Sequence, residues 1–287
     1  ITELTEFGPG AAVLVSYTTR FVVPSVHGLA LNDSPGLTEQ HGEWSGKTLV
    51  AGTYSLALLA HDSRITFFAG EVNLFPIAAT AQRVEFQVQD APVARPYDLI
   101  DLPAACNNCH QDLRFHAGEY RGFASCLGCH GTAGAEDRPR YVAANAPDTP
   151  GVEMNFRQLL HKIHRGMQLE SVPGYFVVGA GGLPYPNNFQ LGFFNTIQFP
   201  AFPGRTSECV KCHGADNTAW MLPAGRDHPF EQDVSVRGWR AACMSCHDSA
   251  SSLAHGDANT APNGVESCAV CHGLEEHESV ELVHRSR

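Results

Sequence analysis

The sequence has little positive charge, few methionines and no long apolar run. Its 287 residues include 19 Lys and Arg against 30 Asp and Glu, a formal net charge of -11, and no basic run occurs. Nucleic-acid binders and proteins held on anionic lipid need clustered Lys and Arg, so both classes are excluded. No apolar stretch approaches the roughly 18 residues of a membrane span, so we expect no transmembrane segment. The opening residues ITELTEFGPG lack the pattern of a signal peptide, and we expect a soluble chain from which that peptide has been removed.

Cysteine is absent before Cys106, and no cysteine occurs singly after it. All ten cysteines lie in five copies of C-x-x-C, and each copy is followed directly by histidine. Histidine fills only 15 of the 287 positions, so five histidines after five cysteine pairs indicate one repeated motif, C-x-x-C-H. The five copies are Cys106/Cys109/His110, Cys126/Cys129/His130, Cys209/Cys212/His213, Cys243/Cys246/His247 and Cys268/Cys271/His272.

This motif is typical of covalent haem attachment. Two thiols add to the two vinyl groups on one edge of the porphyrin, and the histidine that follows places its imidazole on the iron. All three residue types are needed together, so we predict five covalently attached haem c groups. Covalent attachment takes place outside the cytoplasm, which predicts a protein that is periplasmic, at the cell surface or released; of these we favour an extracellular or cell-surface location.

Two other interpretations of the cysteines are weaker. The first two cysteine pairs are sixteen residues apart, a spacing that also suits a zinc ribbon. Zinc does not explain the five histidines, and an odd number of pairs leaves one pair without a partner. Redox-active dithiols usually occur singly on a thioredoxin-like unit. We therefore favour haem.

The chain has two regions that differ in composition and expected secondary structure. Residues 1–100 are predicted to form an all-β domain, an antiparallel sandwich or split barrel, in which His27, His41 and His61 are ordinary surface histidines. Residues 101–287 are predicted to form a mostly irregular, part-helical pentahaem domain, with loops rich in Gly, Pro, Asn and Ser. The strands of the first region are expected in AAVLVSYTT, TYSLALLAH, RITFFAGEVNLF and QRVEFQVQ.

One helix is expected in the second region, in NFRQLLHKIHRG. Its apolar stripe is Phe156, Leu159, Leu160, Ile163 and Met167. His161 and His164 lie about 60° apart on one flank of this stripe, so both can face haem, and they can serve two different haems. The alternative is one ligand and one structural histidine.

Residues 171–204 contain no charged residue. We expect this segment to form a haem-covering lid of hairpins and loops. A surface buried against a subunit or partner is the alternative.

The ligand on the far side of each iron separates an electron carrier from a catalyst. An open face can bind nitrite, peroxide or hydroxylamine, whereas a second histidine closes it. Ten histidines remain outside the motifs against only four methionines, which favours bis-histidine ligation. Seven of these ten lie in the haem region: His116, His161, His164, His228, His255, His277 and His284.

Several stretches resemble the OmcA/MtrC family, the extracellular multihaem cytochromes of metal-reducing bacteria. The run RPYDLIDLPAACNNCHQDLRFHAGEYRGFASCLGCHG is similar to the family's opening haem pair, and NFRQLLHKIHRG is similar to its HKIH helix. FNTIQFP, SCHDSASSLAHG and VELVHRSR resemble further family stretches. The resemblance covers about residues 50 to 287. It implies the distal ligands His116, His161, His164, His255 and His284.

The resemblance also implies a function. We expect extracellular electron transfer through five bis-histidine haems rather than enzymatic catalysis, with non-specific reduction of metals or shuttles as a side activity. Expected partners are other cytochromes or copies of the chain, and mineral, humic or flavin acceptors. Two assemblies remain open: a polymeric filament, or nanowire, and a discrete soluble or porin-docked carrier or terminal metal reductase. A pentahaem nitrite-reductase-type enzyme is the remaining alternative, but such enzymes usually carry lysine in place of one motif histidine.

Overall fold

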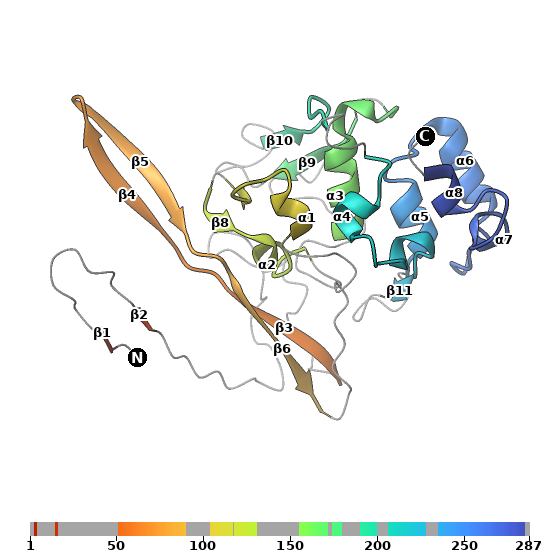
Figure 1. Ribbon diagram of the computed structural model, residues 1–287, viewed down its shortest axis with the longest axis horizontal. Coiled ribbons are helices and arrows are strands. Elements are labelled where there is room, and N and C mark those ends of the chain that lie inside the picture. Colours follow the sequence, from red (N-terminus) through yellow and green to blue (C-terminus); the bar gives the residue numbers. More distant parts are fainter. Residues whose placement is uncertain are drawn as a thin grey trace.

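The computed structural model describes ten stretches of the chain, and they form a β-ribbon attached to a body of short helices (Figure 1). The stretches are residues 3–4, 15–16, 51–89, 104–116, 118–130, 155–171, 174–179, 190–199, 206–227 and 235–284. None of the helices in these stretches is long and apolar enough to cross a membrane.

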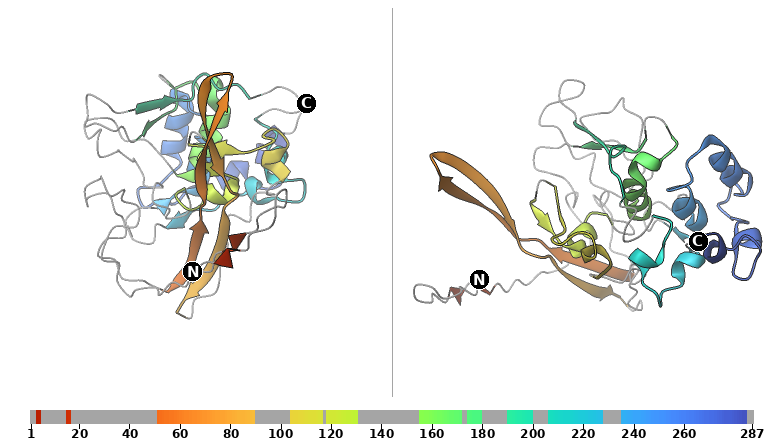
Figure 2. Two further views of the ribbon diagram at one scale, coloured as in Figure 1. Left: turned by 90° about the vertical axis from the view of Figure 1, so that its left-hand side faces the viewer. Right: turned by 45° about the horizontal axis from the view of Figure 1, so that its top comes forward.

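The first region is antiparallel β structure, as the sequence predicts. β3 (Gly52–Leu58) pairs with β6 (Gln82–Val88), and β4 (His61–Phe68) pairs with β5 (Glu71–Ala78). In the described residues these are two-stranded sheets, and they follow one another in one long ribbon (Figures 1 and 2). The segment expected as one strand, residues 64–75, is in fact the hairpin of β4 and β5.

The turn of this hairpin is Ala69-Gly70. Both residues have positive φ, 51° and 83°, which matches the two-residue turns whose twist suits a hairpin. The first expected strand is described only where β2 (Val15–Ser16) pairs with β1 (Glu3–Leu4). The rest of that strand lies outside the described residues, as do His27, His41 and His228.

The second region is mostly irregular with short helices, which confirms the expected architecture. The longest helix among its described residues is α3 (Phe156–Arg165). The other helices are α1 (Ala104–Asn107), α2 (Phe123–Cys126), α4 (Val210–His213), α5 (Gly238–Cys243), α6 (Ala250–Ala258), α7 (Ala269–His272), α8 (Val280–His284) and the 3-10 helices η2 (Gly166–Gln168) and η3 (Ala219–Met221). The strands are β7 (Arg114–Phe115), β8 (Tyr120–Arg121), β9 (Phe176–Gly179), β10 (Gln190–Phe193), β11 (Arg226–Asp227) and β12 (Ser235–Val236), paired as successive hairpins.

The start and end of α3 follow from its sequence. The Asn155 side chain accepts a hydrogen bond from the Arg157 N–H, 3.2 Å away, and so caps the first turn. Gly166, with φ of 44°, ends the helix. Of the expected apolar stripe, Phe156 and Leu159 are buried, whereas Met167 falls beyond the helix end in η2 and is exposed.

The core sits between α2, α3 and the β9–β10 hairpin. Phe156 is almost fully buried and packs against Phe123, with ring centroids 5.3 Å apart. The remaining buried members of this cluster are Leu127, Leu159 and Tyr175. Part of the uncharged segment 171–204 thus forms a hairpin that packs on α3.

The helices that carry the C-x-x-C-H motifs are spread along the long axis of the molecule. α2 lies nearest the β-ribbon, α1 and α4 lie at the centre, and α7 lies at the far end (Figures 1 and 2). Contacts between α1 and α4, and between α3 and α5, connect this series.

Candidate haem sites

All five C-x-x-C-H motifs have the same backbone turn. In each copy the carbonyl oxygen of the first cysteine accepts hydrogen bonds from the N–H of the second cysteine, at 3.1–3.2 Å, and of the histidine, at 2.7–2.9 Å. Residues i, i+3 and i+4 of a helical turn lie on one face. Each turn therefore presents two thiols and one imidazole on the same side.

Four motif histidines each face a second histidine from another segment. The centroid distances are 6.1 Å for His110 and His164, 6.4 Å for His213 and His161, 6.0 Å for His247 and His284, and 6.3 Å for His272 and His255. Every second member belongs to the distal set that the resemblance implies. The two histidines of α3 face two different motifs, as their helical spacing predicts.

These separations suit one metal ion between two imidazoles. Two rings that bind a metal from opposite faces, each through a bond of about 2 Å, have centroids roughly 6 Å apart. In the described part of the chain no three His, Cys, Asp or Glu side chains group as they would around a single metal ion. Two thiols and two facing imidazoles are the donor set of a haem c site, so the residues present fit haem.

The tautomer of several rings also fits metal binding through Nε2. The Nδ1 atoms of His164 and His284 lie 2.8 and 2.9 Å from the carbonyl oxygens of Leu160 and Val280, one helical turn earlier. Nδ1 of His272 lies 2.9 Å from the Glu278 carbonyl oxygen. An Nδ1–H that donates to a carbonyl leaves Nε2 as the free acceptor for a metal.

Burial favours the neutral form of the two α3 histidines. Burial, assisted by the nearby His213, lowers the pKa of His161 to about 4. Burial likewise lowers the pKa of His164 and of His247. In this region Phe199 also packs edge-on against His164, with centroids 6.0 Å apart, so the uncharged segment covers this ring.

The first thiol of each motif is partly buried, and thiols of neighbouring motifs lie close to one another. Burial raises the pKa of Cys126 and Cys243 to about 12, and the charges of Cys106 and Cys268 add to these respective shifts. Burial is also the main cause of the raised pKa values of Cys209 and Cys212, to which thiols of the fourth and the first motif contribute. Each motif thus has a neighbouring motif in a continuous series.

The fifth motif histidine, His130, has a different ring environment. It is buried and stacks on Phe156, with centroids 6.3 Å apart. His116, the remaining distal candidate, has φ of 50° and packs edge-on against Tyr120, 5.3 Å away. The assignment of His116 to the His130 motif therefore rests on the family resemblance.

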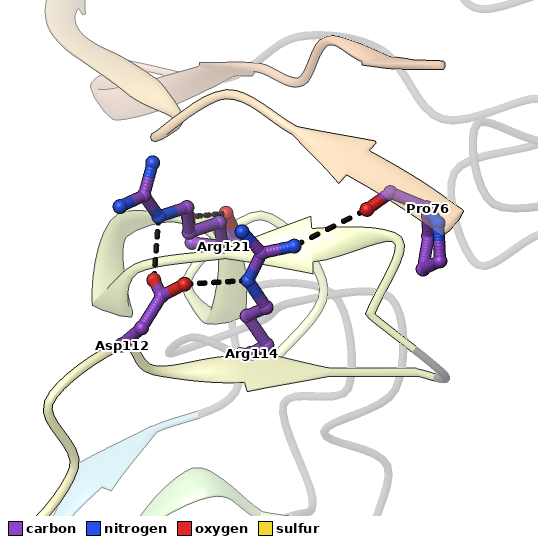
Figure 3. Close-up of polar contacts among 5 residues, drawn as sticks. Pro76, Asp112, Arg114 and Arg121 are labelled. Atoms are coloured by element: carbon purple, nitrogen blue, oxygen red, sulfur yellow. Dashed lines mark hydrogen bonds and ion pairs between the residues drawn. The ribbon is translucent and has the colours of Figure 1, made fainter. Parts of the chain in front are cut away.

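The turn that carries His116 is braced against the β-ribbon. Asp112 accepts hydrogen bonds from Nε of both Arg114 and Arg121, each at 2.6 Å (Figure 3). Arg114 also donates to the Pro76 carbonyl oxygen in β5, at 3.2 Å. These contacts connect the β7–β8 turn to the hairpin that precedes it in the sequence.

Two carboxylates that the sequence analysis did not single out hold the α5 motif in place. Asp248, directly after His247, accepts hydrogen bonds from the backbone N–H groups of residues 170 and 171, at 2.7 and 3.1 Å. Glu266 accepts from the N–H groups of Trp239 and Arg240, at 3.0 and 2.8 Å, and so caps α5. An acidic residue directly after C-x-x-C-H was a usable signal for Asp248, but nothing local pointed to Glu266.

Comparison with known proteins identifies the second region. The family model of outer membrane cytochromes, MtrC/MtrF-like, domains II/IV, matches residues 101–285, which is nearly two thirds of the chain. A search of curated proteins found no match. A search of solved structures found none either.

Proposed function

Because this chain belongs to the MtrC/MtrF-like family of outer membrane cytochromes, which are extracellular multihaem electron-transfer proteins, we propose that it transfers electrons through five bis-histidine haem c groups. The observation that carries this proposal is the set of four facing histidine pairs. A family resemblance alone predicts haem, whereas the four pairs support two histidine ligands for each of four irons.

The proposed axial ligands combine each motif histidine with one distal histidine. The pairing of His130 with His116 rests on the family resemblance and on the assignment of the other four distal histidines. The five proposed pairs are His110/His164, His130/His116, His213/His161, His247/His284 and His272/His255, with thioether bonds from Cys106, Cys109, Cys126, Cys129, Cys209, Cys212, Cys243, Cys246, Cys268 and Cys271.

The residues of such a site hold and close the iron rather than react. Bound haem supplies one-electron exchange between ferric and ferrous iron. The two thiols of each motif would hold one macrocycle in position, and one motif histidine and one distal histidine would hold its iron, which would leave no position for a small substrate. The fixed carbonyl partners of His164 and His284 hold their rings in one orientation, which limits rearrangement during electron exchange.

We propose that electrons pass through the motifs in spatial order. Supporting this are the positions of the motif helices along the long axis and the contact between α1 and α4. The proposed path runs from the Cys126 motif through the Cys106, Cys209 and Cys243 motifs to the Cys268 motif. An electron would then travel between the β-ribbon and the far end of the molecule.

The assembly we propose is a polymeric filament, in which the last haem of one copy meets the first haem of the next. Repeated head-to-tail contacts grow without closing. Other cytochromes and mineral, humic or flavin acceptors are then the partners at the filament ends and sides. Electron microscopy of the native extracellular fraction, with a haem-stained gel to identify the chain, tests this: uniform filaments support it, and discrete particles indicate a soluble or docked carrier.

The haem assignment has its own test. We expect the mass of the acid-denatured holoprotein to show five covalently attached haems, and its oxidised spectrum to show only low-spin iron. Four haems with one unmodified cysteine pair, or a high-spin fraction in the native state, would contradict the proposal.

A further inference from the structure

The β4–β5 hairpin exposes an apolar face that no haem motif accounts for. Ile65, Phe67, Val72 and Leu74 are between 57 % and 79 % exposed. Ile65 pairs with Leu74 and Phe67 pairs with Val72 across the two strands. Because side chains alternate between the faces of a strand, these four lie on the same face, called here the apolar hairpin face.

The opposite face of the hairpin is mixed in character. Alternation places Arg64, Thr66 and Phe68 of β4 there, opposite Phe75, Asn73 and Glu71 of β5. Charged and polar residues thus lie between the apolar ones on that face. Exposing the apolar hairpin face to water therefore costs more free energy than exposing the opposite face.

Haem does not explain this exposure. Exposed apolar residues in the helical body, such as Val210, Val270 and Leu274, lie within or directly after C-x-x-C-H motifs, where a macrocycle would cover them. The hairpin carries no such motif, and its tip projects away from the helices (Figures 1 and 2). Its position leaves space for another molecule along its length.

A two-stranded ribbon needs a second layer that covers its apolar face. An isolated hairpin is marginally stable in water, and packing against a second layer supplies the missing burial. In the described residues the sheet of β4 and β5 has no third strand. The ribbon also carries little of the chain's negative charge, because residues 61–78 contain only Asp62, Arg64 and Glu71 as charged residues. Mutual repulsion of two acidic chains is therefore weakest here.

The size of the apolar hairpin face suits a second copy of the chain. A large apolar side chain buries on the order of 100–200 Å², so four that are more than half exposed, in two copies, bury roughly 1,000 Å² together with their backbone. About this area is needed for a specific interface.

We propose that the apolar hairpin face is a self-association surface, on which two copies of this chain pack ribbon against ribbon. The contact is isologous, since the same four side chains serve both copies. It is independent of the haem ligands, which lie in the helical body. This contact joins copies two by two. A filament would therefore need a second, different contact between the pairs.

The test compares neighbouring phenylalanines on opposite faces. Phe67 and Phe68 are 79 % and 78 % exposed, so Phe67→Ser and Phe68→Ser remove equal apolar surface from the two sides. Analytical ultracentrifugation of the holoprotein over a range of concentrations measures dimer dissociation. We expect Phe67→Ser to raise the dissociation constant at least ~10-fold and Phe68→Ser to change it much less. Equal effects of the two variants would overturn the proposal.

A second pair of variants keeps the test valid if one variant of the first pair misfolds. Leu74→Ser lies on the apolar hairpin face and Phe75→Ser on the other, and an unchanged haem spectrum confirms that the helical body is intact. Hydroxyl-radical footprinting of the wild type gives the decisive result. Protection of Phe67 that appears only at dimerising concentrations supports the proposal. A monomer at all concentrations would overturn it. Protection that does not depend on concentration would also overturn it, because the chain itself or another partner would then cover this face.

Discussion

At the scale of single residues, the histidines of the proposed sites are oriented by their own backbone. His164 and His284 use Nδ1 for the carbonyl oxygen of the residue four positions earlier, which lies in the same helix. These local hydrogen bonds fix the orientation of each imidazole ring. Substituting such a histidine should therefore change one iron without disturbing the others.

The variant His284→Met tests this independence. A thioether in place of the imidazole stabilises ferrous iron relative to ferric iron, so we expect the potential of the haem at His247 to rise by on the order of 0.1 V. Spectroelectrochemical titration of the holoprotein measures this change as one component in five.

The control is His277→Met, because His277 is exposed and its Nδ1 pairs with its neighbour Glu278. It should leave all five potentials unchanged. A titration curve of His284→Met that coincides with the wild type would show that another residue binds the iron at His247.

At the residue scale the sequence predicted the motifs and the distal candidates, but it did not predict the contacts between distant residues that support them. The motifs are local, and the four facing pairs agree with the distal residues implied by family resemblance. The bond from the residue 170 N–H to Asp248 joins residues 78 positions apart, and that from Arg240 to Glu266 joins residues 26 positions apart. Such contacts depend on how loops return to the body, which spacing does not encode.

At the scale of elements, α3 has a central role because it presents two proposed ligands to two different motifs. Its Asn155 cap stabilises the first turn, near Phe156 and the His130 ring. We expect Asn155→Ala to lower the free energy of unfolding by about 1 kcal/mol, because the first N–H groups lose their acceptor. Thermal unfolding followed by circular dichroism measures this loss.

Asn155→Asp supplies the matched control, since aspartate caps helices as well as asparagine does. It should unfold at nearly the wild-type temperature. Equal destabilisation by alanine and aspartate would show that the amide at residue 155 has a role other than capping.

The joint between the β-ribbon and the β7–β8 turn gives another element-scale prediction. Gly118 has φ of 89°, and a Cβ atom there would lie 2.9 Å from Cγ of Pro76. Gly118→Ala should therefore loosen the joint and speed hydrogen exchange of the Ala81 amide, which donates to the Arg121 carbonyl oxygen. Mass-spectrometric hydrogen exchange measures this rate.

Gly70→Ala separates the steric contact from backbone strain. Gly70 has φ of 83° at the hairpin tip, and nothing lies within 4 Å of the position of its Cβ. Both alanines pay the cost of a left-handed backbone, about 1–2 kcal/mol. Only Gly118→Ala should speed hydrogen exchange at Ala81. A similar change in both variants would show that the contact between residue 118 and Pro76 does not hold the β-ribbon to the β7–β8 turn.

The elements differed in how far the sequence predicted them. α3 was predictable because Asn155, its apolar stripe and Gly166 are separate local signals. The hairpin turn inside RITFFAGEVNLF was missed, because strand-forming residues continue on both sides and Ala69 is a weak turn signal at φ of 51°. Met167 was assigned to the stripe although the helix had already ended.

At the scale of the whole molecule, the central claim is that five closed irons form one conductor. The motif helices follow one another along the long axis, from α2 beside the β-ribbon to α7 at the far end (Figure 1). An open iron anywhere in this series would add a site for small-molecule chemistry. The pair His130/His116 is the first one to test, because its assignment rests on the family resemblance.

The most direct measurement is the addition of carbon monoxide to the fully reduced holoprotein. Carbon monoxide binds ferrous haem that has a free axial position, and two histidines exclude it. Five closed irons predict an absorption spectrum that is unchanged by the gas. A carbon monoxide adduct at one haem in five would contradict the claim and make the open haem a candidate catalytic site.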